Sequence, residues 1–166
     1  MLRLGRPPED FLVAFLNTLD VEDGTDQCAD DKSWRAWLAA EGVDGDGVDP
    51  DVGSRERSRD LRDELRSWMT GEGPISMSLS VSVVLRGERR PESEVVLEAQ
   101  DLPGLVAVAI TRLHAENRLD RVKICPADDC LWAFYDVSRN HSRTWCSMEE
   151  CGNRAKARAF QARRRG

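Results

Sequence analysis

The sequence predicts an α+β fold, with a helical body and a small antiparallel sheet over residues 1–120 and a smaller module of a β-hairpin and a helix over residues 121–166. Three observations support this division. Apolar residues recur at helical spacing in several segments of the body, and one segment alternates between apolar and small polar residues. Four of the five cysteines, moreover, lie after residue 120.

The two parts also differ in charge. Residues 1–120 contain 14 Lys and Arg against 25 Asp and Glu, a balance of −11, whereas residues 121–166 contain 10 against 5, a balance of +5. The whole-chain balance of −6 therefore conceals an acidic body joined to a basic end. Such an asymmetry indicates that the basic end seeks a polyanion.

Three helices are expected in the first part of the body. The first covers 10–20, where five apolar residues recur at helical spacing, and the second covers 31–40. After an exposed loop over 41–53, we expect a third helix that Ser54 caps and Gly71 ends. The many Arg, Asp and Glu residues of this third helix predict a solvated face with pairs four residues apart.

A hairpin and a fourth helix complete the predicted body. Apolar residues alternate with Ser and other small residues over eleven positions from Ile75 to Leu85, which predicts a strand with one buried and one polar face. A turn around Gly87 leads to a partner strand over 94–99. Pro103 suits a first helical position and opens a helix that continues through Leu113.

The body shows no motif that carries chemistry. It has no glycine-rich phosphate loop and no metalloprotease helix motif, and we expect structural roles for His114 and Cys28. We therefore expect that the protein is not an enzyme. The sequence also lacks a signal peptide and an apolar run of about 18 residues, so we expect a cytoplasmic protein without a membrane partner. In that reducing compartment, clustered cysteines are metal ligands or catalytic groups more often than disulfides.

The cysteines form two closely spaced pairs. Cys125 and Cys130 are separated by four residues, fifteen residues follow, and Cys146 and Cys151 are again separated by four. Each pair lets one turn present two thiolates, so together they can complete the tetrahedral shell of one structural Zn²⁺ in a treble-clef-like module. Two disulfides, four free thiols, or a site in which His141 replaces one thiolate are the alternatives.

The segment between the pairs is rich in aromatic residues. Trp132, Phe134, Tyr135 and Trp145 suit a hairpin whose rings cover the metal, and Asp136 suits its turn. Stacking on nucleic-acid bases is the alternative for these rings. We favour packing for Trp132 and Phe134, and leave Tyr135 open.

The last segment predicts a basic helix. Ser147 and Glu150 form a capping box, which places Cys151 in the first turn and the positive helix end near the thiolates. A helix of this kind can enter a major groove or lie along phosphates, although its cations also complement the helix dipole in a merely solvated end. The residues expected to contact nucleic acid are Arg154, Lys156, Arg158, Arg163, Arg164 and Arg165.

These motifs resemble those of a known family. Residues 145–156 resemble the signature of the CGNR zinc-finger family, and residues 151–154 are that tetrapeptide itself. Cys125-Pro126 with Cys130, and the Trp132-x-Phe134-x-Asp136 segment, also match its pattern. Phe15-Leu16-Asn17-Thr18 resembles an early motif of the ABATE domain, which usually precedes this zinc finger.

The resemblance implies a bacterial, stress-induced transcription regulator that binds DNA through its zinc module. A homodimer would add contacts at two half-sites and is one expected partner state. A protein-interaction adaptor, whose zinc module docks a transcription-machinery protein, is the alternative from another class. A third, weaker alternative is an enzyme with a small-molecule pocket in the body.

Overall fold

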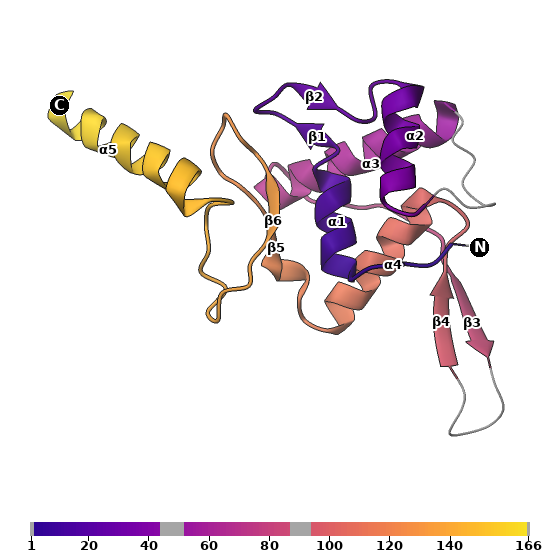
Figure 1. Ribbon diagram of the computed structural model, residues 1–166. Helices are drawn as coiled ribbons and strands as arrows, with labels where there is room; N and C mark the ends of the chain where they lie inside the picture. Colours follow the sequence, from indigo (N-terminus) through magenta and orange to yellow (C-terminus); the bar gives the residue numbers. More distant parts are fainter. Residues whose placement is uncertain (1, 44–51, 87–93, 166) are drawn as a thin grey trace.

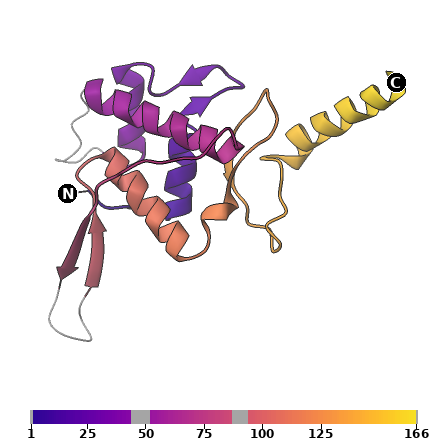
Figure 2. The ribbon, with the colours of Figure 1, turned by 180° about the vertical axis from the view of Figure 1, so that it is seen from behind.

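The computed structural model describes residues 2–43, 52–86 and 94–165, and its mixed composition confirms the predicted fold class. Helices form the centre of the molecule, and short antiparallel strand pairs lie around them (Figure 1). The C-terminal helix extends away from this centre, as the view from behind also shows (Figure 2).

In chain order the elements are α1 (Pro8–Leu16), β1 (Leu19–Asp20), β2 (Thr25–Asp26), α2 (Asp31–Ala40), α3 (Val52–Thr70), β3 (Ser82–Arg86), β4 (Glu94–Glu98), α4 (Leu102–Ala115), a 3₁₀ turn (Leu119–Arg121), β5 (Val122–Ile124), β6 (Ala133–Tyr135), a π-helical turn (Met148–Gly152) and α5 (Asn153–Arg165). The strands form three antiparallel pairs, β1 with β2, β3 with β4 and β5 with β6.

The core lies between α1, α3 and α4, and the β5–β6 hairpin closes one end of it. The apolar stripe of α1 is fully buried against α4, and Trp34 of α2 is also inaccessible to solvent. Val122 of β5 and Ala133 of β6 belong to the same cluster of buried side chains. The hairpin that starts the predicted C-terminal module therefore shares its core with the body, although a domain boundary near residue 120 stays a prediction.

The first two helices show where the predicted boundaries are right and wrong. The second helix has the predicted bounds, and Asp30 caps it by accepting hydrogen bonds from two backbone amides. The first helix ends at Leu16 and not near Asp20. Leu19–Asp20 instead pairs with Thr25–Asp26 in a small hairpin that turns at Gly24, which has a φ of +65°.

The third helix begins earlier than predicted. It starts at Val52, so Ser54 lies inside the helix and does not cap it, whereas Gly71 has the expected left-handed φ of +82°. Residues 44–51 of the predicted loop lie outside the described residues.

The predicted strand over 75–85 is only partly a strand. Residues 74–81 are extended without a strand partner, and only Ser82–Arg86 pairs with Glu94–Glu98. The predicted turn at Gly87 lies outside the described residues. The fourth helix starts at Leu102, where Asp101 caps it, so Pro103 occupies the second helical position.

The prediction that the charged face of α3 is solvated is partly wrong, because some of its residues are buried. Arg62 and Arg66 are only 1% and 7% exposed, and Ser54 and Ser58 beside them are also buried. Arg62 donates two hydrogen bonds to the carboxylate of Asp26, at 2.6 and 3.1 Å. A buried guanidinium requires such a partner, so this ion pair fixes the β1–β2 hairpin on α3.

We expect the variant Asp26→Asn to destabilise the protein by about 3 kcal/mol, the low end of the range for a broken buried ion pair. The value is at the low end because Asp63 also contacts Arg62, at 2.9 Å. Urea unfolding measures the change. The matched control is Asp60→Asn on the solvent face of the same helix, where the side chain is 78% exposed and we expect less than about 0.5 kcal/mol.

The same pair predicts a pH dependence. Burial alone would raise the pKa of Asp26, but the hydrogen bonds and charge of Arg62 lower it below the ordinary 3.8. A depressed carboxyl pKa contributes stability that is present above pH 3.8 and is lost as the pH falls through the lower, folded-state pKa. The difference in unfolding free energy between the native protein and Asp26→Asn should therefore shrink below about pH 4. A difference that stays constant from pH 7 to pH 3 would contradict this account.

Candidate metal centre

The β5–β6 hairpin positions the first cysteine pair. Cys125 directly follows β5, and its amide donates to the carbonyl of Trp132 at 2.9 Å. The chain then turns so that the amides of Cys130 and Leu131 both donate to the carbonyl of Ala127, each at 3.0 Å. Leu131 has a φ of +52°, a left-handed conformation that completes the tight turn. This turn brings both sulfurs of the pair to the same side.

A buried carboxylate positions the second pair. Asp136, which the sequence assigned only to a turn, is inaccessible to solvent. One of its oxygens accepts from Lys123 Nζ at 2.6 Å and from the amide of Arg143 at 3.0 Å. Burial alone would raise the pKa of Asp136, but these hydrogen bonds hold it well below its usual value. The ionised Asp136 thus returns the long loop to the hairpin just before Cys146.

The second pair ends at the start of the last helix. Ser147 caps this helix, because its hydroxyl accepts from the amide of Glu150 at 3.2 Å, as the sequence predicts. The first turn is π-helical rather than α-helical, and Cys151 lies within it and is buried. The last cysteine and helix α5 are therefore parts of one continuous element.

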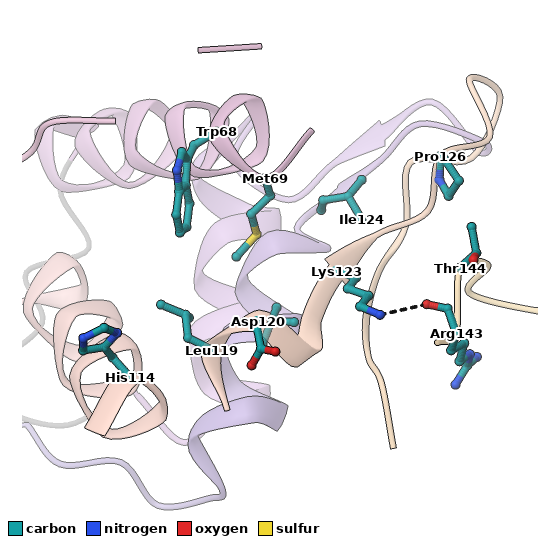
Figure 3. Close-up of a pocket in the computed structure, with 11 residues that line it drawn as sticks. Trp68, Met69, His114, Leu119, Asp120, Lys123, Ile124, Pro126, Arg143 and Thr144 are labelled. Carbon is teal, nitrogen blue, oxygen red and sulfur yellow. Dashed lines mark hydrogen bonds between the residues drawn. The ribbon is translucent and has the colours of Figure 1, made fainter. Parts of the chain in front are cut away.

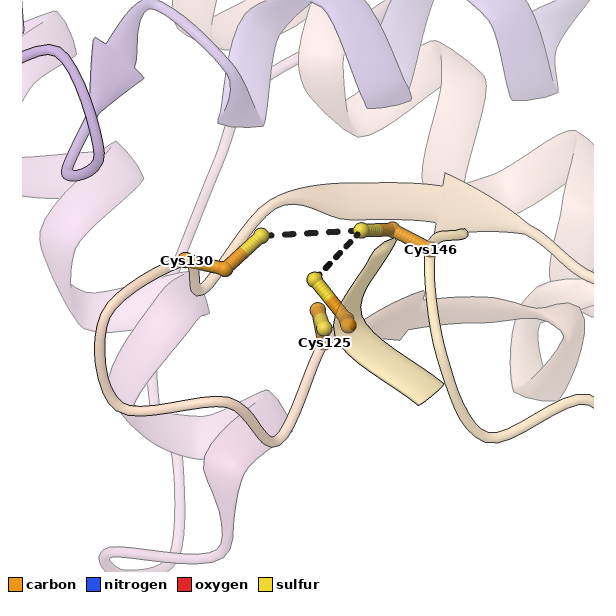
Figure 4. Close-up of side chains that lie close together, drawn as sticks. Cys125, Cys130 and Cys146 are labelled. Carbon is orange, nitrogen blue, oxygen red and sulfur yellow. Dashed lines mark hydrogen bonds between the residues drawn. The ribbon is translucent and has the colours of Figure 1, made fainter. Parts of the chain in front are cut away.

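The structure brings the four predicted cysteines together. Their sulfur atoms all lie within 4.8 Å of one another, with 3.5 Å between Cys130 and Cys146 and 3.6 Å between Cys146 and Cys151 (Figure 4). Tetrahedral zinc with bonds of about 2.3 Å requires sulfur separations of roughly 3.8 Å. The donor set therefore fits one structural Zn²⁺ ion. Four thiolates fill its coordination shell and leave no position for water or substrate.

Two of the alternatives for this site do not match the structure. Disulfides are absent from the cluster, because the sulfur separations are far longer than the roughly 2.05 Å of an S–S bond. His141 is not a fourth ligand, because its ring nitrogen contacts Asp120 at 2.9 Å. Cys28 is a separate, buried thiol, and burial raises its pKa to about 11.

An arginine contacts the sulfur cluster from outside. Arg154 Nη2 donates to the sulfur of Cys151 at 3.1 Å, and Nη1 of the same residue donates to Glu22 of the β1–β2 turn at 2.9 Å. Burial alone would raise the pKa of Cys151, but the hydrogen bonds from Arg154 and the other thiols lower it. Because a metal ligand must be deprotonated, Arg154 favours the form of Cys151 that binds zinc.

The aromatic residues only partly follow the prediction. Phe134 is buried beside the cysteines, and the guanidinium of Arg143 lies 4.9 Å from its ring centre. The prediction that Trp132 packs in the interior is wrong, because it is 37% exposed next to Cys130 and Cys146. Tyr135 packs on the body, where its hydroxyl accepts from Arg118 at 2.8 Å.

Two polar side chains to which the sequence analysis assigned no contact attach the module to the body. Asn17 forms two hydrogen bonds with the backbone of Ala133, at 2.7 and 2.9 Å, as a neighbouring strand would. Arg66 donates to the carbonyl of Leu16 at 2.8 Å and to that of Leu131, beside Cys130, at 2.9 Å. A buried arginine of α3 therefore binds the turn that holds the first cysteine pair.

The predicted basic residues fall into two groups. Arg154 and Arg158 have carboxylate partners, since Arg158 contacts Asp128 at 3.1 Å and Asp129 at 2.6 Å. The side chains of Lys156 and Arg163 are exposed and form no hydrogen bond or ion pair within the described part of the chain. The guanidinium of Arg164 lies 5.7 Å from the ring centre of Phe160, and the side chain of Arg165 lies outside the described part.

A cavity of about 730 Å³ lies between the body and the module (Figure 3). Trp68 and Met69 of α3 line one side, and Lys123 and Arg143 line the other. These two cations already have structural partners: Lys123 donates to Asp136 and to two carbonyls of the loop, and Arg143 donates to the carbonyls of Trp145 and Cys146. The charged groups on this side therefore serve the fold of the module.

The fold and the sulfur geometry together define a four-cysteine structural zinc module, and comparison with known families agrees. Residues 121–164 match the model of the CGNR zinc finger. The match covers the module and leaves residues 1–120 outside it. No curated protein matches the chain. Within the described residues, every helix is too short or too polar to cross a membrane.

We expect the purified protein to contain one zinc per chain and the variant Cys146→Ser to lose most of it, because three thiolates no longer close the shell. Elemental analysis together with a protein assay measures the ratio. Cys28→Ser is the matched control and should retain the metal, since Cys28 lies outside the cluster. Equal zinc content in the two variants would show that the cluster is not the metal site.

The contact of Arg154 with Cys151 predicts an effect on affinity. We expect Arg154→Ala to weaken zinc binding by about tenfold, the lower end of the effect typical of groups that support a metal ligand. Competition with a chromogenic chelator gives the dissociation constant. Arg163→Ala removes the same charge from the far end of the helix and should leave the affinity unchanged; an equal loss would mean that only net charge matters.

Proposed function

We propose that the protein is a DNA-binding transcription regulator in which the zinc module holds α5 against duplex DNA. The observation that carries this proposal is the placement of α5, which extends away from the body (Figures 1 and 2) and has exposed cations along its length. An isolated helix of this length is marginal in water, so a helix held out in this way is suited to bind a partner. The basic character of the module favours a polyanion.

The two groups of basic residues support different roles. Lys156, Arg163, Arg164 and Arg165 are the proposed phosphate and base contacts. Arg154 and Arg158 connect α5 to acidic residues of the cysteine turn and of the β1–β2 turn. We therefore assign these two the task of orienting the helix, in contrast to the sequence-based expectation that all six contact DNA.

The acidic body suits a role other than DNA contact. With its balance of −11, it would be repelled by phosphates, which favours an approach to DNA through α5 alone. We propose that residues 1–120 form an ABATE-like domain that senses an effector or dimerises. The closed sulfur shell, together with the structural partners of Lys123 and Arg143, supports a regulator rather than an enzyme.

One observation favours a second function, a protein-interaction adaptor. Phe160 and Met148 are 55% and 51% exposed on the same helical segment that presents the cations. Large exposed apolar side chains are more typical of protein-binding helices than of helices that contact only phosphates. In this alternative, the module docks a protein of the transcription machinery, and DNA binding is absent.

The proposed contacts predict the salt dependence of DNA binding by the full chain. Four phosphate contacts give a slope of about −4 for log K against log salt concentration, whereas six would give about −5. Fluorescence anisotropy with a labelled duplex of mixed sequence measures the slope between 50 and 200 mM salt, roughly the range over which such contacts are weakened. Binding that is absent at low salt, or insensitive to salt, would favour the adaptor.

Charge reversal locates the contacts. We expect the double variant Arg163→Glu, Arg164→Glu to weaken binding at least a hundredfold, because it replaces two attractions with two repulsions. The control is Arg139→Glu, which reverses an exposed cation on the loop of the same module. If Arg139→Glu lowers the DNA affinity as much per reversed charge as the α5 variant does, net charge and not α5 determines binding.

A further inference from the structure

The β3–β4 hairpin has an apolar face that the rest of the chain does not cover. It extends away from the helices in both views (Figures 1 and 2). Val83 of β3 and Val95 of β4 are each 67% exposed. The register pairs Val83 with Leu97, and Val95 lies two residues from Leu97, so these side chains share one face of the ribbon.

The segment upstream of the hairpin has an apolar stripe that the body covers. Ile75, Met77 and Leu79 alternate with exposed serines and pack against the core of the body. Val83 continues this alternation in the sequence, but within the hairpin the opposite face is the covered one, because Val96, the partner of Val84, is only 6% exposed. The alternation in the sequence therefore extends over more residues than those of β3 that pair with β4.

The two edges of the hairpin differ. The edge of β4 is occupied at its base, where Ala99 forms two backbone hydrogen bonds with Leu2, at 2.7 and 3.0 Å. Within the described residues, β3 pairs only with β4, so its outer edge is open. An open edge beside an apolar face is a template for a further strand, and a two-stranded hairpin alone is only marginally stable.

The charge pattern favours a second copy of this chain, paired through β3, as the occupant. If two β3 strands pair antiparallel about a two-fold axis at Val83, each valine meets its symmetry mate. The only charged residue of β3 is Arg86, so no like charges lie opposite each other. Pairing two β4 strands about Val96 would instead place Glu94 opposite Glu98, which is unfavourable.

We propose that the protein forms a homodimer through antiparallel pairing of the open β3 edges, which joins two hairpins into one four-stranded sheet. The valines beside the two-fold axis gain cross-strand apolar neighbours, and the unpaired backbone groups of β3 gain partners. This dimer does not depend on DNA binding by α5, and failure of either proposal leaves the other intact.

The test is the mass of the full chain in solution. Light scattering during size exclusion, at loading concentrations from about 1 to 100 µM, brackets the range of weak to moderate dimers. We expect a mass that rises to twice the 18.7 kDa of the chain. We expect Val83→Lys to raise the dissociation constant at least tenfold, because it brings two cations together at the axis. A native protein that stays monomeric throughout would overturn the proposal.

A matched control separates the proposed edge from exposed apolar surface in general. Val137, 76% exposed on the module's loop, lies far along the chain from the hairpin, and Val137→Lys should dimerise like the native protein. Zinc content and circular dichroism show whether each variant is folded. If Val83→Lys does not fold, hydrogen exchange in β3 of the native protein tests the same edge.

Hydrogen exchange identifies the strand involved. Amides of residues 81–85 should exchange more slowly as the dimer forms, because pairing converts the open edge into a ladder. A dimer that Val83→Lys leaves intact, that Val137→Lys dissociates equally, or that gives no added protection in β3 would contradict pairing through this edge.

Discussion

The arrangement of the C-terminal part depends on one requirement, that four sulfurs from two separate turns reach a single ion. The hairpin turn supplies two of them, the loop that Asp136 holds leads to Cys146, and the first turn of the last helix supplies Cys151. Structural zinc in small modules contributes about 10–16 kcal/mol, comparable with the whole stability of a typical domain. Without that contribution, few apolar contacts would hold the last helix in any fixed direction, since its residues beyond the first turn are mostly exposed.

The body supplies a rigid support for this arrangement through buried polar groups. Arg62 orders the β1–β2 hairpin, whose turn provides Glu22 for Arg154. Arg66 and Asn17 bind the backbone of the cysteine hairpin directly. Two kinds of contact therefore determine the direction of α5. The cysteine cluster holds its first turn, and acidic residues of the β1–β2 turn and of the cysteine turn bind Arg154 and Arg158.

Features with local causes were predictable from the sequence. The spacing of the cysteines indicated the ligand set, and the helical spacing of apolar residues, together with Pro103, located α2 and α4 closely. Features with distant causes were not predictable. The burial of Arg62 depends on Asp26, 36 residues away, and the length of β3 depends on how much partner strand the chain supplies. The serines at 54 and 58, eight and four positions before Arg62, were the only local sign that this face of α3 turns inward.

The hydrogen bond from Arg66 to Leu131 has a thermodynamic consequence. The carbonyl of Leu131, which accepts this bond, is next to the ligand Cys130. The turn that the metal orders is therefore the same turn that α3 binds. Metal occupancy and the folding of the helical body are then linked equilibria. Each tenfold increase in free zinc above the dissociation constant adds about 1.4 kcal/mol to the stability of the occupied protein. Helix α3, whose Arg66 lies 85 residues before the last ligand, can in this way respond to the metal supply of the cell.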